Sequence, residues 1–202
     1  RVSKFIFDTS RKATKEKISS LPNKSATGSL TIDGYSKPIT IKVKLTILKT
    51  KIVCDFSGTS EVDTNGINVP LVYTKAYTCY ALKCAIAPEI PNNTASLEPF
   101  KIIAQKNSIV NAIYPSPVAL RHIIGHFIPD TVYNALDKIL PNLVPAEGAG
   151  TLCNFQVSLR PAAKFPSARH KKRAEILTFN SGGSGARPTV DGMNATAFPS
   201  GV

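Results

Sequence analysis

The fold is organised around the stretch Asp55-Phe-Ser-Gly-Thr-Ser-Glu-Val-Asp-Thr-Asn-Gly-Ile-Asn-Val-Pro70. A pattern typical of a β-strand precedes this stretch, and a pattern typical of an α-helix follows it. Gly58 and Gly66 allow the backbone to turn where a Cβ atom would obstruct it. Pro70 suits the first turn of a helix, so Asn68 or Val69 is expected to be the cap. The stretch therefore predicts a strand, a polar turn and a capped helix.

Polar side chains in this turn are candidates for binding. A glycine-containing turn between a strand and a helix commonly holds an anion or a polar substrate. The alternative is a tight connection whose hydroxyl groups satisfy its own backbone, and for Asp55 this role is favoured over substrate contact. The candidates for substrate or interface binding are Asp55, Ser57, Thr59 and Asn68.

The elements on either side of the turn are the best defined. Apolar and polar residues alternate through Ile39–Ile47, which is the period of a strand with one buried face. Lys51–Phe56 is expected to return as its antiparallel partner. Leu71–Ala87 has the spacing of a helix, closed by Pro88. Its expected buried face consists of Val72, Ala76, Cys79, Tyr80 and Cys84.

The other elements complete the prediction of fold class. Arg1–Lys17 is expected to be the tail of a helix, and Ala119–Phe127 and Asp130–Leu140 are helical patterns separated by Pro129, which should break or kink the helix. Further strands are expected at Gly28–Asp33, Phe100–Ala104, Ile109–Ile113, Leu152–Val157 and Glu175–Asn180. Together they predict an α+β domain with a largely antiparallel or mixed sheet and helices packed on it.

Charge and cysteine content limit the classes of partner and compartment. The chain of 202 residues has a net charge of +12, concentrated in residues 1–51 and in a second cluster formed by Arg169, Lys171, Lys172 and Arg173. This charge would suit a nucleic-acid or polyanion-binding module, but no aromatic residues interleave with the basic ones, so nucleic acid is a disfavoured partner. The four cysteines form no CxxC pair, and their expected role as small buried thiols suits a reducing cytoplasm. No apolar run is long enough to cross a membrane.

Two further groups carry possible chemistry. His122 and His126 are four residues apart, a spacing at which two side chains can share a metal ion, although Pro129 spoils the geometry of Asp130 as a third ligand. The alternative for this pair is a polar helix face at a subunit contact. Gly182, Gly183 and Gly185 precede Arg187 in a polar loop that lacks the ending of a P-loop. The loop is either a linker or an anion-binding segment in which Arg187 offers a bidentate fork.

Several motifs together resemble the hydantoinase B/oxoprolinase family. They are Asp55–Ser60 with Asn65–Pro70, then His122–Asp130, Pro145–Thr151, and Gly182–Pro188 with Asp191-Gly192. The motifs occur in family order, and the ordered set is specific where each motif alone is weak. By this resemblance, residues 1–27 are the end of a preceding element with a linker. Residues 28–202 are then the C-terminal region of an N-methylhydantoinase B-type subunit, a single domain cut from a larger subunit.

The resemblance implies a function shared between subunits. Members act with an ATP-binding A-type subunit that phosphorylates the substrate, and they open a cyclic amide of the hydantoin or 5-oxoproline type. Relatives carboxylate ketones, an alternative that these motifs do not separate from hydrolysis. ATP and a divalent metal are expected in the complete enzyme, as is a homo- or hetero-oligomer. The family's metal motifs lie upstream, so this chain alone is expected to be inactive and to bind neither cofactor.

Overall fold

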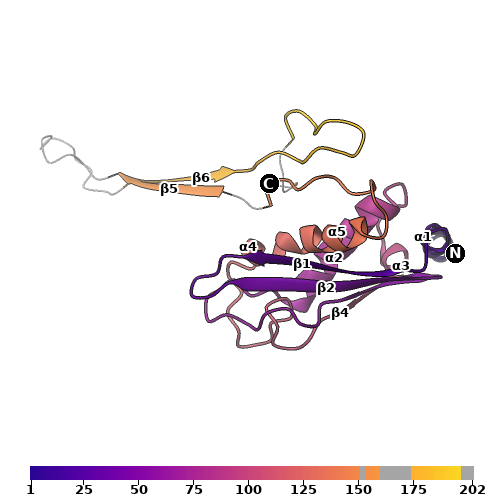
Figure 1. The fold of residues 1–202 in the computed structure, drawn as a ribbon, viewed down its shortest axis with the longest axis horizontal. Coiled ribbons are helices and arrows are strands. Elements are labelled where there is room, and N and C mark those ends of the chain that lie inside the picture. The colour runs from indigo at the N-terminus through magenta and orange to yellow at the C-terminus, as the bar shows by residue number, and fades with distance from the viewer. Residues whose placement is uncertain (151–152, 160–173, 197–202) are drawn as a thin grey trace, which may run out of the picture.

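The computed structural model describes residues 1–150, 153–159 and 174–196. The second basic cluster, at 169–173, lies outside these residues. In chain order (Figure 1), the elements are α1 (Val2–Ser19), β1 (Ser25–Ile32), β2 (Ile39–Leu48), β3 (Lys51–Asp55), α2 (Leu71–Ile86), α3 (Thr94–Leu97), β4 (Phe100–Ile103), α4 (His122–Gly125), α5 (Phe127–Asp137), β5 (Cys153–Leu159) and β6 (Ala174–Asn180).

The main sheet is mixed and has the strand order β1-β2-β3-β4. β1 pairs with β2 and β2 pairs with β3 in antiparallel fashion, whereas β3 and β4 are parallel. Parallel neighbours need a crossover connection, which α2 and α3 provide here. The mixed sheet with helices packed on it confirms the predicted α+β class.

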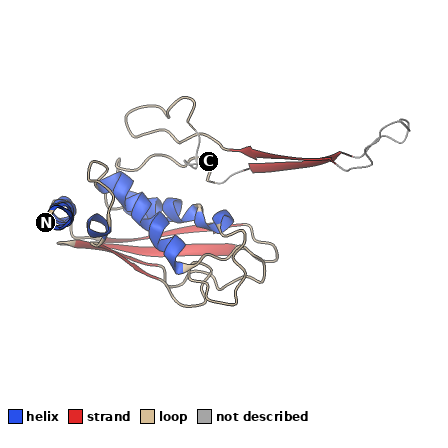
Figure 2. Ribbon diagram, turned by 180° about the vertical axis from the view of Figure 1, so that it is seen from behind, coloured by secondary structure: helices blue, strands red, loops and turns tan. Residues whose placement is uncertain are grey.

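The hydrophobic core lies between this sheet and the helices on one of its faces (Figure 2). Strand β2 has the predicted alternation, and its inward residues are at most 2% exposed: Ile39, Ile41, Val43, Leu45 and Ile47. α5 packs across β1 and β2, and α2 packs beside α5. Burying each of these β2 side chains contributes roughly 1.5–3 kcal/mol, so the face that α5 covers is strongly specified.

The helix α2 exists as predicted, but its predicted buried face is wrong. Val72 is 73% exposed, whereas Thr74, Thr78 and Leu82 are fully buried. The threonine Thr74 can enter the core because its hydroxyl donates to the carbonyl of Val110 at 2.6 Å. Periodicity counted in apolar residues alone therefore selected the wrong side of the helix.

The buried side of α2 also contains a lysine. Lys83 is 5% exposed, and its ammonium donates to the carbonyls of Ala87 and Ile90 just beyond the helix. Burial lowers the pKa of Lys83. The two carbonyls satisfy the charge, and the residue closes the C-terminal end of α2.

Two other boundaries differ from the sequence prediction. The helix breaks at His126, between α4 and α5, rather than at Pro129, which lies in the first turn of α5 where a missing N–H is tolerated. Ile109–Ile113 is not a strand. Its backbone instead bonds the organising turn, with the N–H of Ile109 donating to Ser60 O at 2.8 Å and that of Val69 to Ile109 O at 2.8 Å.

The predicted strands β5 and β6 form a separate antiparallel hairpin instead of extending the main sheet. The hairpin projects from the body of the molecule (Figure 1). Phe155, Leu159, Ile176 and Leu177 are each between 48% and 63% exposed on it. Within the described part of the chain, no helix is both long and apolar enough to cross a bilayer.

Replacing Gly28 should loosen the contact between β1 and α5. A Cβ atom at Gly28 would lie 2.4 Å from Thr131 O and 2.7 Å from Ala135 N, both backbone atoms of α5. We expect Gly28→Ala to lower the free energy of unfolding by about 2–3 kcal/mol in urea titrations. Gly66→Ala is the control, because its Cβ would meet its nearest atoms at 3.6 Å. Equal stabilities of the two variants would contradict this packing.

Candidate functional site

The organising turn uses the side chains of Asp55, Ser57 and Thr59 in its own structure. Asp55 Oδ1 accepts from the backbone N–H of Ser57 at 2.9 Å and from its hydroxyl at 2.6 Å. Thr59 Oγ1 donates to Lys42 O and accepts from Lys42 N, both at 3.0 Å. The Asp55 bonds are local to the turn, whereas the Thr59 bonds join it to β2. None of the three residues lines the large cleft of the structure.

Asn68 holds the second half of the turn. It is fully buried, and its Oδ1 accepts from the N–H of Asp63 at 2.7 Å. Its Nδ2 donates to the carbonyls of Asp63, Asn65 and Pro117 at 2.8–3.0 Å. The residue that precedes the first turn of α2 is Pro70, so the predicted cap at Asn68 or Val69 is wrong. The carboxamide instead joins the turn to the segment before α4.

The two C-terminal glycine motifs lie side by side. The N–H of Ala146 donates to Ala186 O at 2.7 Å, and that of Ala149 donates to Gly183 O at 3.3 Å. The approach is so close that a Cβ at Gly185 would lie 1.9 Å from Ala146 O, and one at Gly182 would lie 2.2 Å from Ala149 Cβ. Glycine is therefore required here by contact between segments that are far apart in the sequence.

These paired segments, together with α2 and α5, enclose a cleft of about 1000 Å³. Two of the predicted site residues, Gly185 and Arg187, line it, while Gly182 and Gly183 do not. The other side chains there that can carry chemistry are Tyr80, Cys84, Asp130, Tyr133, Asp137, Glu147 and Ser184. The cleft thus collects residues from α2, from α5 and from both glycine motifs.

Asp130 has the most perturbed carboxyl group of the cleft. Burial, and after it the charge of Glu147, raises the pKa of Asp130 to about 6. Its Oδ2 is buried and has no hydrogen-bond partner among the described residues. Gly150 lies beside this oxygen: its φ of +67° favours glycine, and a Cβ there would lie 3.8 Å from Oδ2.

The same surroundings disfavour the ionised forms of neighbouring groups. Burial raises the pKa of Tyr133, and partial loss of hydration around the sulfur raises the pKa of the Cys84 thiol. Cys84 is exposed and lines the cleft, so the prediction that it is a buried thiol is wrong, whereas Cys54 is fully buried as predicted. The cleft is therefore an environment in which acids tend to keep their protons.

Arg187 shapes the loop in which it lies. Its N–H donates to Val190 O at 2.9 Å, and its guanidinium donates to Asp191 O through Nε at 3.3 Å and Nη2 at 3.2 Å. The side chain thereby closes the turn of residues 187–191 at the wall of the cleft. Nearby, Ser184 Oγ is buried without a hydrogen-bond partner among the described residues.

His122 and His126 lie close together, but no third metal-binding side chain joins them among the described residues. The rings of His122 and His126 are 5.9 Å apart, and His126 also packs against Tyr77 at 5.7 Å. His126 is 8% exposed, and burial lowers its pKa. Across the described ranges, no group of three His, Cys, Asp or Glu residues is placed to hold a metal ion.

Sequence reasoning missed the cleft, although one signal for it was present. Asp130, Tyr133 and Asp137 recur at spacings of three and four on α5 and line the same wall. This polar stripe lies opposite the apolar stripe of the helix. The sequence suggests Asp130 only as a partner for the histidines, because its closeness to Gly150 and the effect of the Glu147 charge depend on tertiary structure.

A family model described as hydantoinase B/oxoprolinase matches residues 1–201. The chain belongs to the hydantoinase B/oxoprolinase family. This result confirms the resemblance inferred from the ordered motifs.

Two curated relatives of this family member are longer than the chain. A protein of Pseudomonas sp. (strain NS671), provisionally named as the B-type subunit of a D-/L-hydantoinase, is 28% identical over 207 residues, which cover 96% of this chain and 33% of the relative. An uncharacterized protein of Methanocaldococcus jannaschii is 34% identical over 125 residues, 61% of this chain and 22% of its own length. The chain thus spans about a third or less of the length of these curated relatives.

Two solved structures share the fold of this hydantoinase B/oxoprolinase-family chain. An ATP-dependent caprolactamase from Pseudomonas jessenii has a TM-score of 0.65 at 13% identity, over 90% of this chain and 33% of its own. A nucleotide-free acetone carboxylase has a TM-score of 0.68 at 13% identity, over 93% of this chain and 27% of its own.

A side chain at Gly185 should force the two motif segments apart. We expect Gly185→Ala to raise hydrogen exchange of the amides of Ala146 and Ala149 by at least about tenfold, because these bonds would open more often. Gly183→Ala is the matched control in the same loop, since a Cβ there meets nothing within 4 Å. Unchanged exchange in Gly185→Ala, measured by mass spectrometry, would contradict the pairing.

Removing the Asp130 carboxyl should stabilise the fold at neutral pH. The folded pKa of about 6 exceeds the ordinary 3.8, so the folded state favours the protonated form. The stability from this group is complete below pH 3.8 and is lost as pH rises through 6. The stability gain is the unfolding free energy of Asp130→Asn minus that of the parent protein. We expect this gain to be about 1–2 kcal/mol larger at about pH 7.5 than at about pH 4, a value already reduced for solvent screening.

Urea titrations at the two pH values measure this difference. Asp137→Asn is the control, because it removes an exposed carboxyl from the same helix and should change stability by less than about 0.5 kcal/mol. A difference for Asp130→Asn that did not change with pH would contradict the buried state of the group.

Proposed function

We propose that this chain is part of the B-type subunit of an ATP-dependent amidohydrolase that opens a cyclic amide of the hydantoin or 5-oxoproline type. It acts with an ATP-binding A-type subunit or domain, in a homo- or hetero-oligomer in the cytoplasm. The single observation that supports this role best is the cleft in which both glycine motifs, Asp130 and Arg187 meet. Family membership supplies the reaction class.

The chemistry of the reaction suits such a cleft. An amide carbonyl is a poor electrophile, and phosphorylation of its oxygen makes the carbon easier to attack. The B-type site then has to admit an anionic phosphorylated intermediate and to exclude stray water. Backbone N–H groups of glycine segments and the guanidinium of Arg187 are donors of the required kind.

The cofactors belong to the complete enzyme in this proposal. ATP is expected on the A-type subunit. A divalent metal is expected from the family, but the described residues do not fit it, since they offer no group of three metal-binding side chains. No step is therefore assigned to a metal here.

Ketone carboxylation remains the second candidate. The acetone carboxylase and the caprolactamase resemble this chain to nearly the same degree, with TM-scores of 0.68 and 0.65. The shared fold thus accommodates both reactions, and only a substrate test separates them.

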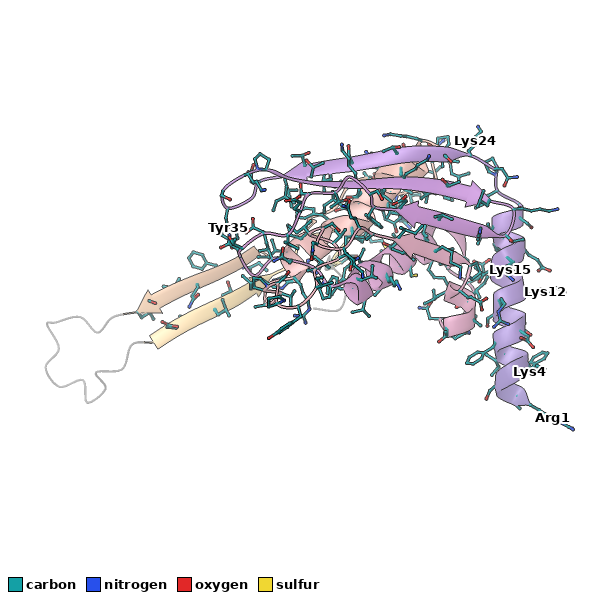
Figure 3. All side chains as sticks on the ribbon, turned by 90° about the horizontal axis from the view of Figure 1, so that it is seen from below. Arg1, Lys4, Lys12, Lys15, Lys24 and Tyr35 are labelled. Carbon is teal, nitrogen blue, oxygen red and sulfur yellow. The ribbon has the colours of Figure 1, made fainter. Side chains whose placement is uncertain are left out.

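A polyanion-binding role would use a different surface. Arg1, Lys4, Lys12 and Lys15 lie along α1 (Figure 3), outside the cleft. Part of the charge of α1 is already neutralised, because Arg11 pairs with Glu98 at 2.7 Å and with Asp8 at 2.8 Å. A filter-binding titration across salt concentrations tests this alternative, which predicts tight binding with a steep salt dependence.

The test of the proposed function uses the complete B-type subunit with its A-type partner. We expect ATP-dependent opening of hydantoin or 5-oxoproline and no ATP-dependent carboxylation of acetone with bicarbonate. Arg187→Ala and Arg187→Lys should each lower kcat/KM by about 10- to 100-fold, because lysine retains the charge but loses the planar fork.

Arg121→Ala is the matched control, since Arg121 is exposed and does not line the cleft. Affinity between the subunits is measured in parallel, so that a loss at the interface is distinguished from a loss at the site. Full turnover and full subunit affinity in both Arg187 variants would remove Arg187 from the proposal. Carboxylation without hydrolysis would replace the reaction class.

A further inference from the structure

Asp130 stands apart from the other carboxyl groups of the structure. It lies on α5 at the wall of the cleft, and its Oδ2 is buried with no hydrogen-bond partner among the described residues. Gly150 lies beside this oxygen, since a Cβ built on it would be 3.8 Å away. An ionised carboxylate so placed would lose the hydration it has in water without any compensating bond.

The charges around Asp130 do not compensate for this either. Within the described ranges, no ion pair involves Asp130. Glu147, three residues before Gly150, acts in the same direction as burial and helps to raise the pKa of Asp130 to about 6. The titratable and charged groups that share its cleft, from all the elements that form it, are Tyr80, Cys84, Tyr133, Asp137, Glu147 and Arg187.

The one cation among these groups, Arg187, does not pair with Asp130. The guanidinium of Arg187 donates through Nε and Nη2 to the carbonyl of Asp191, and it is not among the groups that shift Asp130. The cleft therefore combines a carboxyl group that keeps its proton up to about pH 6 with space beside it for a ligand. A carboxyl group of this kind can donate a proton.

We propose that Asp130 is a catalytic general acid that protonates the ring nitrogen of the cyclic amide as the C–N bond breaks. This inference rests on the proposed function and assigns a residue to one step of it. Water adds across the C=N bond of the phosphorylated substrate, which gives a tetrahedral carbon bearing the hydroxyl, the phosphoryl oxygen and the ring N–H.

The step that follows is balanced in protons and electrons. The electron pair of the C–N bond goes to nitrogen, which takes the proton of Asp130, while the hydroxyl proton passes to water as the carbonyl forms. The products are an amine and an acyl phosphate, and a second water converts the acyl phosphate to carboxylate and phosphate. Asp130 regains its proton from solvent.

The need for a general acid depends on the nitrogen that leaves. A lactam such as 5-oxoproline releases a basic amine, which cannot depart without a proton. A cyclic imide such as hydantoin can release a much less basic amide-type nitrogen, for which protonation matters less. A general acid at Asp130 therefore predicts that its loss affects the two substrates unequally.

The experiment compares Asp130→Asn, Asp130→Glu and Asp33→Asn in the complete subunit with its A-type partner and ATP. We expect Asp130→Asn to lower kcat by about 10²- to 10³-fold on 5-oxoproline and by less than about tenfold on hydantoin. Asp130→Glu, which still carries a proton, should recover part of the loss. Asp33 is an exposed residue between β1 and β2 outside the cleft, so Asp33→Asn should match the parent.

The pH profile gives a second measurement. In the parent, kcat on 5-oxoproline should fall as pH rises above about 6, and this limb should disappear in Asp130→Asn. An equal loss on both substrates, no loss, or an unchanged limb would overturn the general-acid role while the proposed function stands. Absence of any ATP-dependent amide opening by the parent complex would overturn the function and this inference together.

Discussion

The packing of α5 on β1 and β2 is the contact on which the rest of the structure depends. Gly28 lets the backbone of β1 approach the backbone of α5, and Ile128, Val132 and Leu136 are fully buried on that helix. With 3.6 residues per turn, burying this stripe turns residues at other phases away from the sheet. Asp130 and Tyr133 therefore face the cleft as a consequence of how the core is filled.

The sequence predicts the buried face of an element best where apolar and polar residues alternate with one regular period. The alternation of β2 could be read directly, because one face of that strand is fully buried and the other carries Lys42 and Lys44 in an exposed position. The same reasoning failed for α2. Its core face contains Thr74 and Lys83, whose polar atoms donate to backbone carbonyls, and Thr78, whose hydroxyl is buried without a partner among the described residues.

The candidate site could be predicted only in part, for a related reason. Gly185 and Arg187 are candidates because several glycines precede an arginine in one loop, and both line the cleft. The hydrogen bonds between this motif and the segment of Ala146 and Ala149 are a tertiary contact, and neither segment alone predicts it. Cys84 and Tyr80 were assigned to the core, because their true environment depends on the rotation of α2 and on the loops above it.

Two polar side chains, the fully buried Asn68 and the half-buried Asp130, have different roles in this chain. Asn68 is fully buried, and both its Oδ1 and its Nδ2 are satisfied, so it stabilises the organising turn and has nothing left to offer a ligand. Asp130 has a buried oxygen without a partner among the described residues, and Glu147 adds repulsion. An unsatisfied group of this kind costs about 1–3 kcal/mol, and a neutral amide of the same shape would avoid the repulsion. A carboxyl group that destabilises the fold in a cleft shared with two family motifs is best explained by chemistry in which its proton is used.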